Sequence, residues 1–437
     1  MWGMLVWLVI LSAGLAEGLI FRDGPSPAAN TETAPTGPFA GSGWELQVNY
    51  LNYHGTIISP KHVMTARHLG AAEEVLTRPV VFGAPEEESY AIKGERIVIG
   101  ETDFAIFEVW ETFPVYAELY QGSDEEGREL VIHGSGVGRG DEITGAGWRW
   151  GEGSSRKSRW GRNVIKGSLT SDDRDFLYFD FSDVIGQDEV MATGGDSGGG
   201  WFIQEGGGWK LAAISSSVDG LYSEDPEPSN GNGFRGAIFD GTGLSYGSDS
   251  EGWELIPEDG ESNVPGEIEF YRRSHTYGSR ISSRLGEIEA VIAPALAWEA
   301  LDESGRFLNW LADHGVTTET GANDDPDGDG LSNLEEYLGE SDPGDRQDAE
   351  PLLVFESLPG GAHQFTLRES LDLAGRGLST VLESSVDLEN WDPVENLVEQ
   401  DKVRDNPKGI RLRTLARPSP GPGPLFYRQK VILGPLP

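Results

Sequence analysis

Three segments of the chain place a histidine, an aspartate and a serine where they could act together on an acyl group. His68 closes the segment TIISPKHVMTARH, Asp103 precedes the apolar run FAIFEV, and Ser197 lies in the glycine-rich segment TGGDSGGG. A serine hydroxyl is a poor nucleophile until a neutral imidazole accepts its proton, and a buried carboxylate holds that imidazole in the required tautomer. These residue types predict acyl transfer, with Ser197 as nucleophile, His68 as general base and acid, and Asp103 orienting His68.

The glycines around Ser197 have a chemical reason of their own. Backbone N–H groups must point at the oxyanion that develops during acyl transfer. Residues without a Cβ permit a tight turn with a substrate pressed against it. We therefore expect the amides of Gly195 and Ser197 to form the oxyanion hole.

The order of the three segments separates two classes of serine hydrolase. GDSGG also satisfies G-x-S-x-G, the nucleophile turn of α/β-type esterases, whose histidine follows the serine in the chain. The histidines after Ser197 are His275, His314 and His363, and none lies in such a setting. The order His, Asp, Ser, each beside a strand-like run, therefore disfavours an α/β-type esterase.

The same segments resemble those of the chymotrypsin/trypsin-like serine proteases. The first segment is similar to the family segment ending in TAAH, with Arg67 in place of the second alanine. TDFAIFEV is similar to its D-x-A-L strand, and GGDSGGG is its nucleophile motif. Further matches (VIHGSGVGRG, KLAAISSS, TYGSRISSRLGEIEAVI) extend the resemblance over about residues 44–293. It implies a two-barrel serine endopeptidase that cleaves protein or peptide substrates through an acyl-enzyme. The alternative is a catalytically silent relative that acts as a binding or adhesion protein.

The resemblance also implies a substrate site. It places Ser216 beside the catalytic aspartate, and Ser216, Ser217 and Val218 along the substrate backbone. Counting six residues back from Ser197 puts Met191 at the base of the specificity pocket. Because an aspartate there would select Arg or Lys and Met does not, we expect a preference for apolar or small residues.

Two departures from the family pattern concern how the site is held. His54 and Leu69 occupy the places of a cystine common in the family, so packing alone must hold that loop. In many members a new N-terminal ammonium pairs with the residue before the nucleophile, here Asp196. Leu19 or Ile20 could supply that group, or the protein could satisfy Asp196 internally; both alternatives are open.

A cluster of cations lies at residues 148–163 of an otherwise acidic chain. This segment, WRWGEGSSRKSRWGRN, could steer acidic substrates or be cut autolytically. The simpler interpretation, which we favour, is a solvated loop whose cations pair with local carboxylates.

An acidic segment fits the calcium-loop pattern D-x-D-x-D-G-x5-E. Calcium prefers 6–8 oxygen ligands, which such a loop and the helix after it can supply. The segment resembles thrombospondin type 3 and dockerin loops, and the alternative is an acidic linker without metal. We expect a structural Ca²⁺ ion and no catalytic cofactor. The expected ligands are Asp325, Asp327, Asp329, the carbonyl of Leu331, Asn333 through a water, and Glu336 with two oxygens.

Composition excludes several functions. The chain has 33 Lys and Arg against 73 Asp and Glu, a net charge of -40. Because phosphate and anionic lipid binding need clustered cations, we expect no partner among nucleic acids or anionic membranes. The absence of cysteine from the sequence excludes disulfides, thiolate metal sites and a cysteine nucleophile.

The remaining pattern predicts a mainly β, multi-domain architecture. Residues 1–16 have the apolar run and small-residue end of a signal peptide, with an uncleaved anchor as the alternative. The chain is then expected to be secreted or periplasmic, in a bacterium, with no membrane contact after cleavage. We expect a lead at 17–43, the two-barrel protease domain with its C-terminal helix at 44–293, a short helical calcium-loop linker at 294–349, and a small β-sandwich at 350–437.

Finer expectations concern the second half of the chain. Residues 241–266 are expected to form a long loop, and helical periodicity predicts helices over ISSRLGEIEAVIAPALAW and ESGRFLNWLADHG. The C-terminal part resembles modules of exported proteins from verrucomicrobial and related bacteria, which implies cell-surface or glycan contact. Trp391 is expected in its core, with carbohydrate stacking as the alternative.

Overall fold

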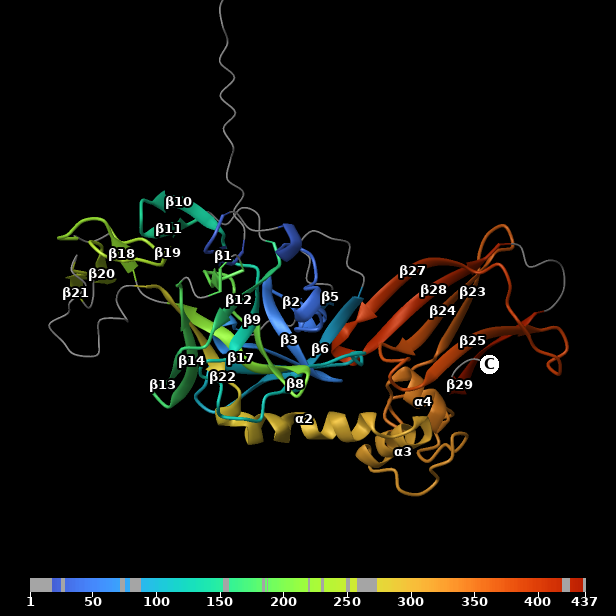
Figure 1. Ribbon diagram of the computed structural model, residues 1–437. Coiled ribbons are helices and arrows are strands. Elements are labelled where there is room, and N and C mark those ends of the chain that lie inside the picture. Colours follow the sequence, from blue (N-terminus) through green and yellow to red (C-terminus); the bar gives the residue numbers. More distant parts are fainter. Residues whose placement is uncertain are drawn as a thin grey trace, which may run out of the picture.

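The computed structural model describes most of the chain and is mainly β (Figure 1). The predicted signal peptide lies outside the described residues, and none of the described helices is long and apolar enough to cross a membrane. The described ranges are 18–24, 28–70, 75–78, 88–151, 157–182, 185–186, 188–218, 221–228, 232–248, 252–257, 273–418 and 425–434.

Six strands close into an antiparallel barrel in the order β2-β3-β4-β7-β6-β5. Nearly every residue of β3, β4 and β7 is buried, because one face fills the barrel and the other packs on neighbouring elements. Val48, Ile57 and Phe107 belong to the interior cluster. The strands are β2 Gln47–Tyr50, β3 Tyr53–Ser59, β4 His62–Ala66, β5 Val75–Arg78, β6 Glu88–Val98 and β7 Phe104–Val109.

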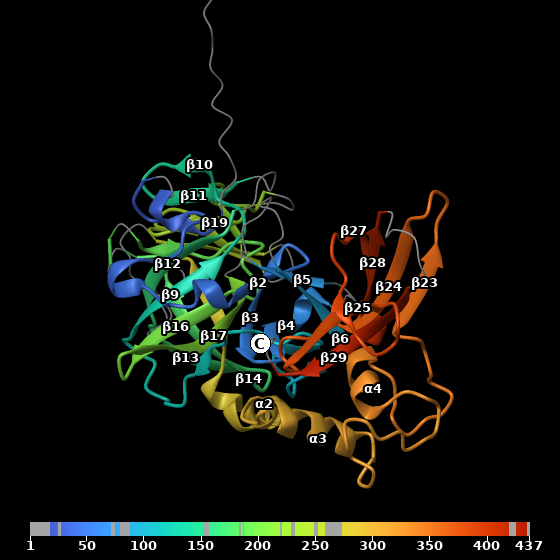
Figure 2. The same cartoon turned by 90° about the vertical axis from the view of Figure 1, so that its right-hand side faces the viewer.

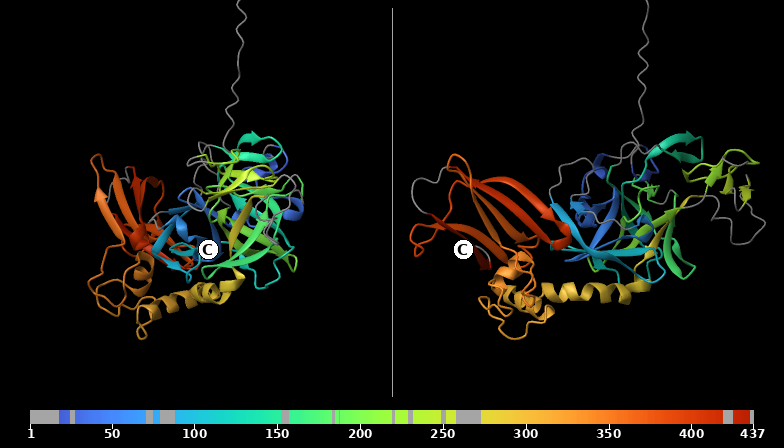
Figure 3. Two further views of the ribbon diagram at one scale, coloured as in Figure 1. Left: turned by 90° about the vertical axis from the view of Figure 1, so that its left-hand side faces the viewer. Right: turned by 180° about the vertical axis from the view of Figure 1, so that it is seen from behind.

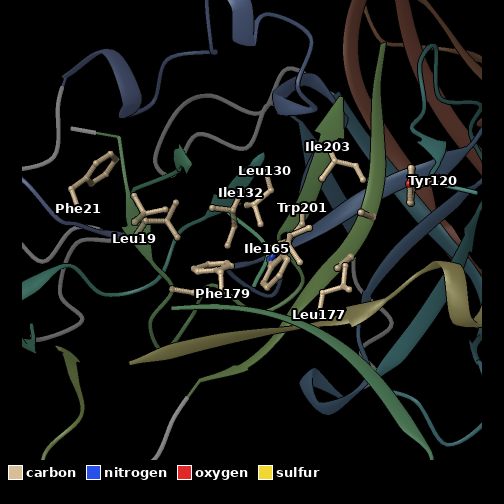
Figure 4. Packing of buried hydrophobic residues seen from close by; sticks show 14 residues of the cluster. Leu19, Phe21, Tyr120, Leu130, Ile132, Ile165, Leu177, Phe179, Trp201 and Ile203 are labelled. Carbon is tan, nitrogen blue, oxygen red and sulfur yellow. The ribbon is translucent and has the colours of Figure 1, made fainter. Parts of the chain in front are cut away.

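A second, eight-stranded sheet follows, ordered β12-β9-β16-β17-β22-β14-β13, with β8 beside β17. Its core holds Trp201 against Phe179, with ring centroids 4.8 Å apart (Figure 4). The described residues provide no pairing that closes this sheet, so only one of the two expected barrels is closed. The strands are β8 Glu118–Leu119, β9 Glu129–Gly134, β12 Arg159–Val164, β13 Gly167–Ser171, β14 Arg174–Asp180, β16 Gly200–Glu205, β17 Gly208–Val218 and β22 His275–Arg280.

Three small sheets surround the second sheet. The expected loop at 241–266 is wrong in its described part, because Tyr246 and Trp253 lie in a hairpin whose strands pair antiparallel. Among the described residues, strands pair antiparallel throughout except β8 with β17, which also disfavours an α/β-type esterase. The strands are β1 Ile20–Phe21 with β15 Val190–Met191; β10 Arg139–Ile143, β11 Gly147–Trp150 and β19 Gly236–Ile238; and β18 Leu221–Ser223, β20 Ser245–Ser248 and β21 Gly252–Leu255.

The helices follow the second sheet. α2 (Leu285–Glu299) packs Ile288 and Ile292 into a cluster that both main sheets share, and it runs through the expected boundary at 293/294. α3 (Glu303–Asp313) is N-capped by Asp302 and buries one face, as its periodicity predicts. The remaining helices are α4 Asn333–Gly339 and the short 3-10 helices η1 Ala28–Asn30, η2 Gly37–Phe39, η3 Trp44–Leu46, η4 Arg67–Leu69, η5 Ser282–Arg284 and η6 Asn406–Lys408.

The C-terminal part consists of two antiparallel sheets, β23-β24-β28-β27 and β26-β25-β29 (Figure 2). Phe365 and Leu415 of the first sheet share a cluster with Leu382 of the second. Trp391 is not in this core: it is half-buried, and the guanidinium of Arg428 lies 4.2 Å from its ring. The strands are β23 Leu353–Ser357, β24 His363–Ser370, β25 Leu378–Ser385, β26 Asp392–Pro393, β27 Val398–Asp405, β28 Ile410–Arg417 and β29 Phe426–Leu433.

These sheets lie beside the closed barrel, at one end of the molecule (Figure 3). Asp372 makes the central contact, because its carboxylate accepts from Lys61 Nζ at 2.5 Å and from the amide of Thr112 at 2.7 Å. Glu111 of the barrel part pairs with Arg404 of β27. These part-buried contacts link the C-terminal sheets to the barrel.

Candidate active site

The closed barrel positions His68 and Asp103 at one end. β4 and β7 are antiparallel neighbours with Ala66 opposite Phe104, so η4 after β4 and the residue before β7 meet. The amide of Arg67 donates to the carbonyl of Asp103 at 2.9 Å, which fixes this approach. The two residues therefore come together although 35 positions separate them in sequence.

Ser197 comes from the other sheet, in the turn between β15 and β16. Two backbone contacts hold that turn against both sheets: His54 N–H donates to Ser197 O at 3.4 Å, and Gly198 N–H donates to Ser215 O at 3.0 Å. Ser197 thus faces the His68 end of the barrel across the boundary between the two sheets.

The three side chains form a continuous hydrogen-bonded line. His68 Nδ1 lies 2.8 Å from Asp103 Oδ2, and His68 Nε2 lies 2.9 Å from Ser197 Oγ. Asp103 also accepts from the amide of His68 at 2.9 Å and from Ser216 Oγ at 2.6 Å. Because the aspartate can only accept when ionised, Nδ1 carries the proton and the lone pair of Nε2 faces the serine hydroxyl.

The environment keeps Asp103 ionised. Its side chain is 10% exposed, while that of His68 is 45% exposed. Burial alone would raise the pKa of Asp103, but the hydrogen bonds from His68 and Ser216 outweigh it and leave the pKa below its usual value. A charged acceptor is thus in place behind the imidazole.

Close approach of backbone explains the glycines after the serine. A Cβ on Gly198 would lie 1.9 Å from the carbonyl oxygen of His54, and one on Gly199 would lie 1.9 Å from that of His133. Gly195, one of the two expected oxyanion donors, has φ of +104°, a conformation that favours glycine. The glycines therefore allow the backbone on both sides of Ser197 to form a tight turn packed against neighbouring strands.

Asp196 is satisfied by the protein itself, the second of the two alternatives left open by the sequence. It is buried and accepts from the amides of Gly136 at 2.5 Å and Thr193 at 2.6 Å. Leu19 and Ile20 instead pack in apolar clusters, where β1 pairs with β15. The expectation that packing alone holds the loop with His54 and Leu69 is wrong in part. Leu69 joins the barrel cluster, but the buried His54 also forms hydrogen bonds, with Nδ1 3.3 Å from Gln47 Oε1 and its carbonyl accepting from Thr65 Oγ1 at 2.7 Å.

A cavity of about 290 Å³ opens beside Ser197. The expectation for Met191 is wrong: its side chain packs with Ile20 and Phe181 and does not line the cavity. Strand alternation is the physical reason, since the next residue, Ala192, faces the opposite side. The lining residues are Trp150, Ala192, Thr193, Gly194, Asp196, Ser197, Ser215, Ser216, Ser217, Val218, Arg235 and Thr276.

Sequence reasoning thus found part of the cavity. Ser216, Ser217 and Val218 line it, whereas Trp150, Arg235 and Thr276 were missed. Strand alternation around Met191 could have identified Ala192. Nothing local marks Arg235, which lies far from Ser197 in sequence.

The described cations at 148–163 pair mainly with carboxylates, as the simpler interpretation predicts, but the solvated loop is wrong for the parts that lie in strands β11 and β12. Arg156 lies outside the described residues. Arg149 pairs with Glu224, and Arg162 pairs with Glu129. Arg159 is fully buried and donates to the carbonyl of Gly18 at 3.0 Å. This segment therefore contributes mostly to structure.

The acidic loop gathers three of its expected ligands. Carboxylate oxygens of Asp325, Asp327 and Asp329 lie within 4.8 Å of one another. Asp325 also shapes the turn, because it accepts from the amides of Gly328 at 2.8 Å and Gly330 at 3.0 Å. Asn333 is buried, and its side-chain amide donates to backbone carbonyls of the preceding segment.

Glu336 is the unusual member of this loop. It is fully buried, yet neither carboxylate oxygen has a hydrogen-bond partner, and one oxygen each of Asp327 and Asp329 is also unpartnered. Burial, and then the neighbouring carboxylates, raise the pKa of Glu336 to about 8. A divalent cation would supply what these oxygens lack, so the donor set fits Ca²⁺.

Comparison with known proteins gives only distant structural similarity. No protein-family model and no curated protein matches the chain. An inactive form of the Rv3671c protease is 14% identical, with 62% of this chain and 98% of that chain covered, at a TM-score of 0.32. Neuropsin, a serine protease expressed in the limbic system of mouse brain, is 11% identical, with 57% and 96% covered, at 0.33. A Glu endopeptidase in complex with MPD is 14% identical, with 48% and 90% covered, at 0.30.

Proposed function

We propose that this protein is a serine endopeptidase in which Ser197, His68 and Asp103 form the catalytic triad. The observation that carries the proposal is the position of His68, whose two ring nitrogens lie 2.8 Å from Asp103 and 2.9 Å from Ser197. Each distance is within the range needed for proton transfer between heavy atoms. The substrates are proteins or peptides.

In the first half of the reaction His68 Nε2 accepts the proton of Ser197 Oγ as that oxygen attacks the peptide carbonyl. Asp103 stabilises the imidazolium that forms and holds its orientation through the Nδ1–H bond. The amides of Gly195 and Ser197 stabilise the oxyanion of the tetrahedral intermediate. His68 then gives its proton to the leaving amine, and the acyl-enzyme remains on Ser197.

In the second half a water molecule repeats the attack. His68 accepts a proton from the water, which adds to the acyl carbon, and Ser197 Oγ leaves with a proton returned by His68. The carboxylic acid is released and the triad is restored. Apart from this water, the groups that move protons in both halves belong to the chain.

The test is hydrolysis of denatured casein by the purified chain. We expect peptide products from the wild type, and a loss of about 10⁶-fold in kcat for Ser197→Ala. Ser168→Ala, in an exposed position of β13, is the matched control and should retain activity. Equal casein hydrolysis by wild type and Ser197→Ala would refute Ser197 as the nucleophile. No hydrolysis by either would refute the proposal and favour a catalytically silent binding protein.

Export of the chain is part of the proposal. Its support is the apolar segment before Glu17, with the small residues Gly14 and Ala16 at its end. Expression with the native leader in a bacterial host should give a product in the periplasm or medium that begins at Glu17. A cytosolic product that retains residues 1–16 would contradict export.

We also propose that the acidic loop holds a structural Ca²⁺ ion. Asp325, Asp327, Asp329 and Glu336 would supply carboxylate oxygens, and the carbonyl of Leu331 would add another. The support is the buried, unpartnered carboxylate of Glu336, which is costly without a cation. The ion would join α4 to the loop before it and take no part in the acyl transfer.

A further inference from the structure

Both apolar and polar groups line the cavity beside Ser197. The hydroxyls of Thr193, Ser215 and Thr276 are already hydrogen-bonded within the protein, whereas Ser217 is exposed. Arg235 is the one cation among the described residues that line this cavity. A substrate side chain that enters the cavity would lie beside Arg235 and Ser217.

Asp196 is the one acidic side chain among the described residues that line the cavity. The two oxygens of Asp196 accept from the amides of Gly136 and Thr193, and Thr193 Oγ1 lies 3.1 Å from Oδ2. These donors are fixed parts of the turn that carries Ser197. The Asp196 carboxylate is therefore held by internal donors. Arg235 is exposed and lines the same cavity.

The backbone places Arg235 at this position. The amide of Trp150 donates to the carbonyl of Arg235 at 2.9 Å. The guanidinium of Arg235 lies 5.8 Å from the centre of the Trp150 ring. Trp150 also covers the turn before the serine, because a Cβ on Gly194 would lie 3.0 Å from its ring. Trp150 thus contacts both Arg235 and the turn that carries Ser197, and it places Arg235 at the cavity wall next to that turn.

We propose that Arg235 makes the enzyme select substrates with an acidic side chain, Glu or Asp, on the acyl side of the cleaved bond. The inference rests on the proposed function and names its substrate class. A guanidinium can bind a carboxylate with two parallel hydrogen bonds, and the hydroxyl of the exposed Ser217 can donate to the same group. An apolar side chain would remove water from these groups without replacing their hydrogen bonds. This replaces the apolar preference that the sequence suggested from Met191.

The experiment uses peptides that are identical except for the residue before the cleaved bond: Glu, Asp, Gln, Leu or Lys. Glu and Gln have nearly the same shape, so the ratio of their kcat/KM values isolates charge. We expect Glu to exceed Gln by about tenfold or more, and Leu and Lys to be cleaved more slowly than Gln. A Glu/Gln ratio near one, or faster cleavage after Leu, would overturn the assignment while leaving the endopeptidase intact. If none of the peptides is cleaved, the proposed function itself fails.

Substitutions of Arg235 test whether this residue causes the preference for Glu over Gln. Arg235→Gln should bring the Glu/Gln ratio close to one while the Gln peptide is still cleaved, and Arg235→Lys should retain a preference for Glu. Arg149→Gln is the matched control, because it removes a nearby cation that pairs with Glu224 and does not line the cavity. If Arg149→Gln lowers the ratio as much as Arg235→Gln does, the general field of the protein causes the preference, and the proposal is wrong.

Discussion

The turn around Ser197 and the acidic loop at 325–336 handle buried charge in opposite ways. Asp196 is buried, the side chain of Asp103 is 10% exposed, and protein donors surround both carboxylates. In the loop, Glu336 is fully buried and its carboxylate has no hydrogen-bond donor. Donors of the chain itself satisfy the carboxylates of the first region, whereas the second region leaves carboxylate oxygens unpartnered. This difference is why we propose a cation for the loop and none for the turn around Ser197.

The largest effect expected from breaking the first region is on catalysis. Asp103→Asn should lower kcat/KM by about 10⁴-fold, because the amide favours the wrong imidazole tautomer while the geometry is kept. Steady-state kinetics on a peptide substrate measures this. Asp141→Asn, an exposed substitution, is the control and should stay within about twofold. A loss below tenfold for Asp103→Asn would mean that His68 is oriented by something else.

A second effect concerns His133, which lies under the nucleophile turn. It is fully buried, and burial lowers its pKa to about 4 against 6.5 for an exposed histidine. The unfolded state therefore binds the proton first, so stability is full above pH 6.5 and is lost as pH falls toward 4. The loss from this group is about 3 kcal/mol at 1.36 kcal/mol per pKa unit.

Urea unfolding from pH 4 to pH 8 measures the His133 contribution. His133→Gln can still donate to the carbonyl of Ser42, which His133 Nε2 contacts at 2.8 Å. We expect this variant to have a flatter pH dependence between 6.5 and 4. An unchanged slope would show that other groups dominate acid unfolding.

Breaking the second region should affect stability and leave catalysis in place. Ca²⁺ at a hundredfold excess over its Kd would add about 2.7 kcal/mol to the stability of the parts it joins, and EDTA would remove it. Thermal unfolding with Ca²⁺ and with EDTA measures the shift. Glu336→Gln should abolish the response, whereas Asp345→Asn, an exposed substitution nearby, should retain it. Identical unfolding temperatures in Ca²⁺ and EDTA would exclude a structural calcium ion.

The smallest expected effect is the loss of the hydrogen bond between Ser216 and Asp103. Ser216→Ala removes the 2.6 Å hydrogen bond to Asp103 and leaves the contacts to His68. A hydrogen bond to a charged group contributes about 1.5 kcal/mol or more, so kcat/KM should fall about tenfold. Unchanged kinetics would show that the two contacts from His68 suffice to hold the aspartate.

Sequence reasoning performed best where one residue type was physically required. His68, Asp103 and Ser197 were named because the chemistry needs those three side chains, and the structure brings them together from both main sheets. The helical face of Phe307, Trp310 and Leu311 in α3 was predicted because amphipathic spacing is a local property.

Prediction from the sequence failed where distant parts of the chain meet. Counting residues back from Ser197 assigned Met191 to the base of the specificity pocket. Because of strand alternation and the pairing with β1, its side chain instead packs in an apolar cluster. Arg235 and Trp150 reach the cavity from separate strands or loops, and no local pattern marks such an approach. The hairpin β20–β21 was missed because its polar residues resemble those of a loop.

Labelling with a fluorophosphonate, followed by mass spectrometry of the modified peptide, tests the central claim most directly. The reagent reacts with a serine only when a base removes its proton and an oxyanion site stabilises the adduct. We predict one adduct per chain, on Ser197, and none in His68→Ala. A wild-type chain that stays unlabelled, or is labelled at another serine, would contradict the assignment of Ser197, His68 and Asp103.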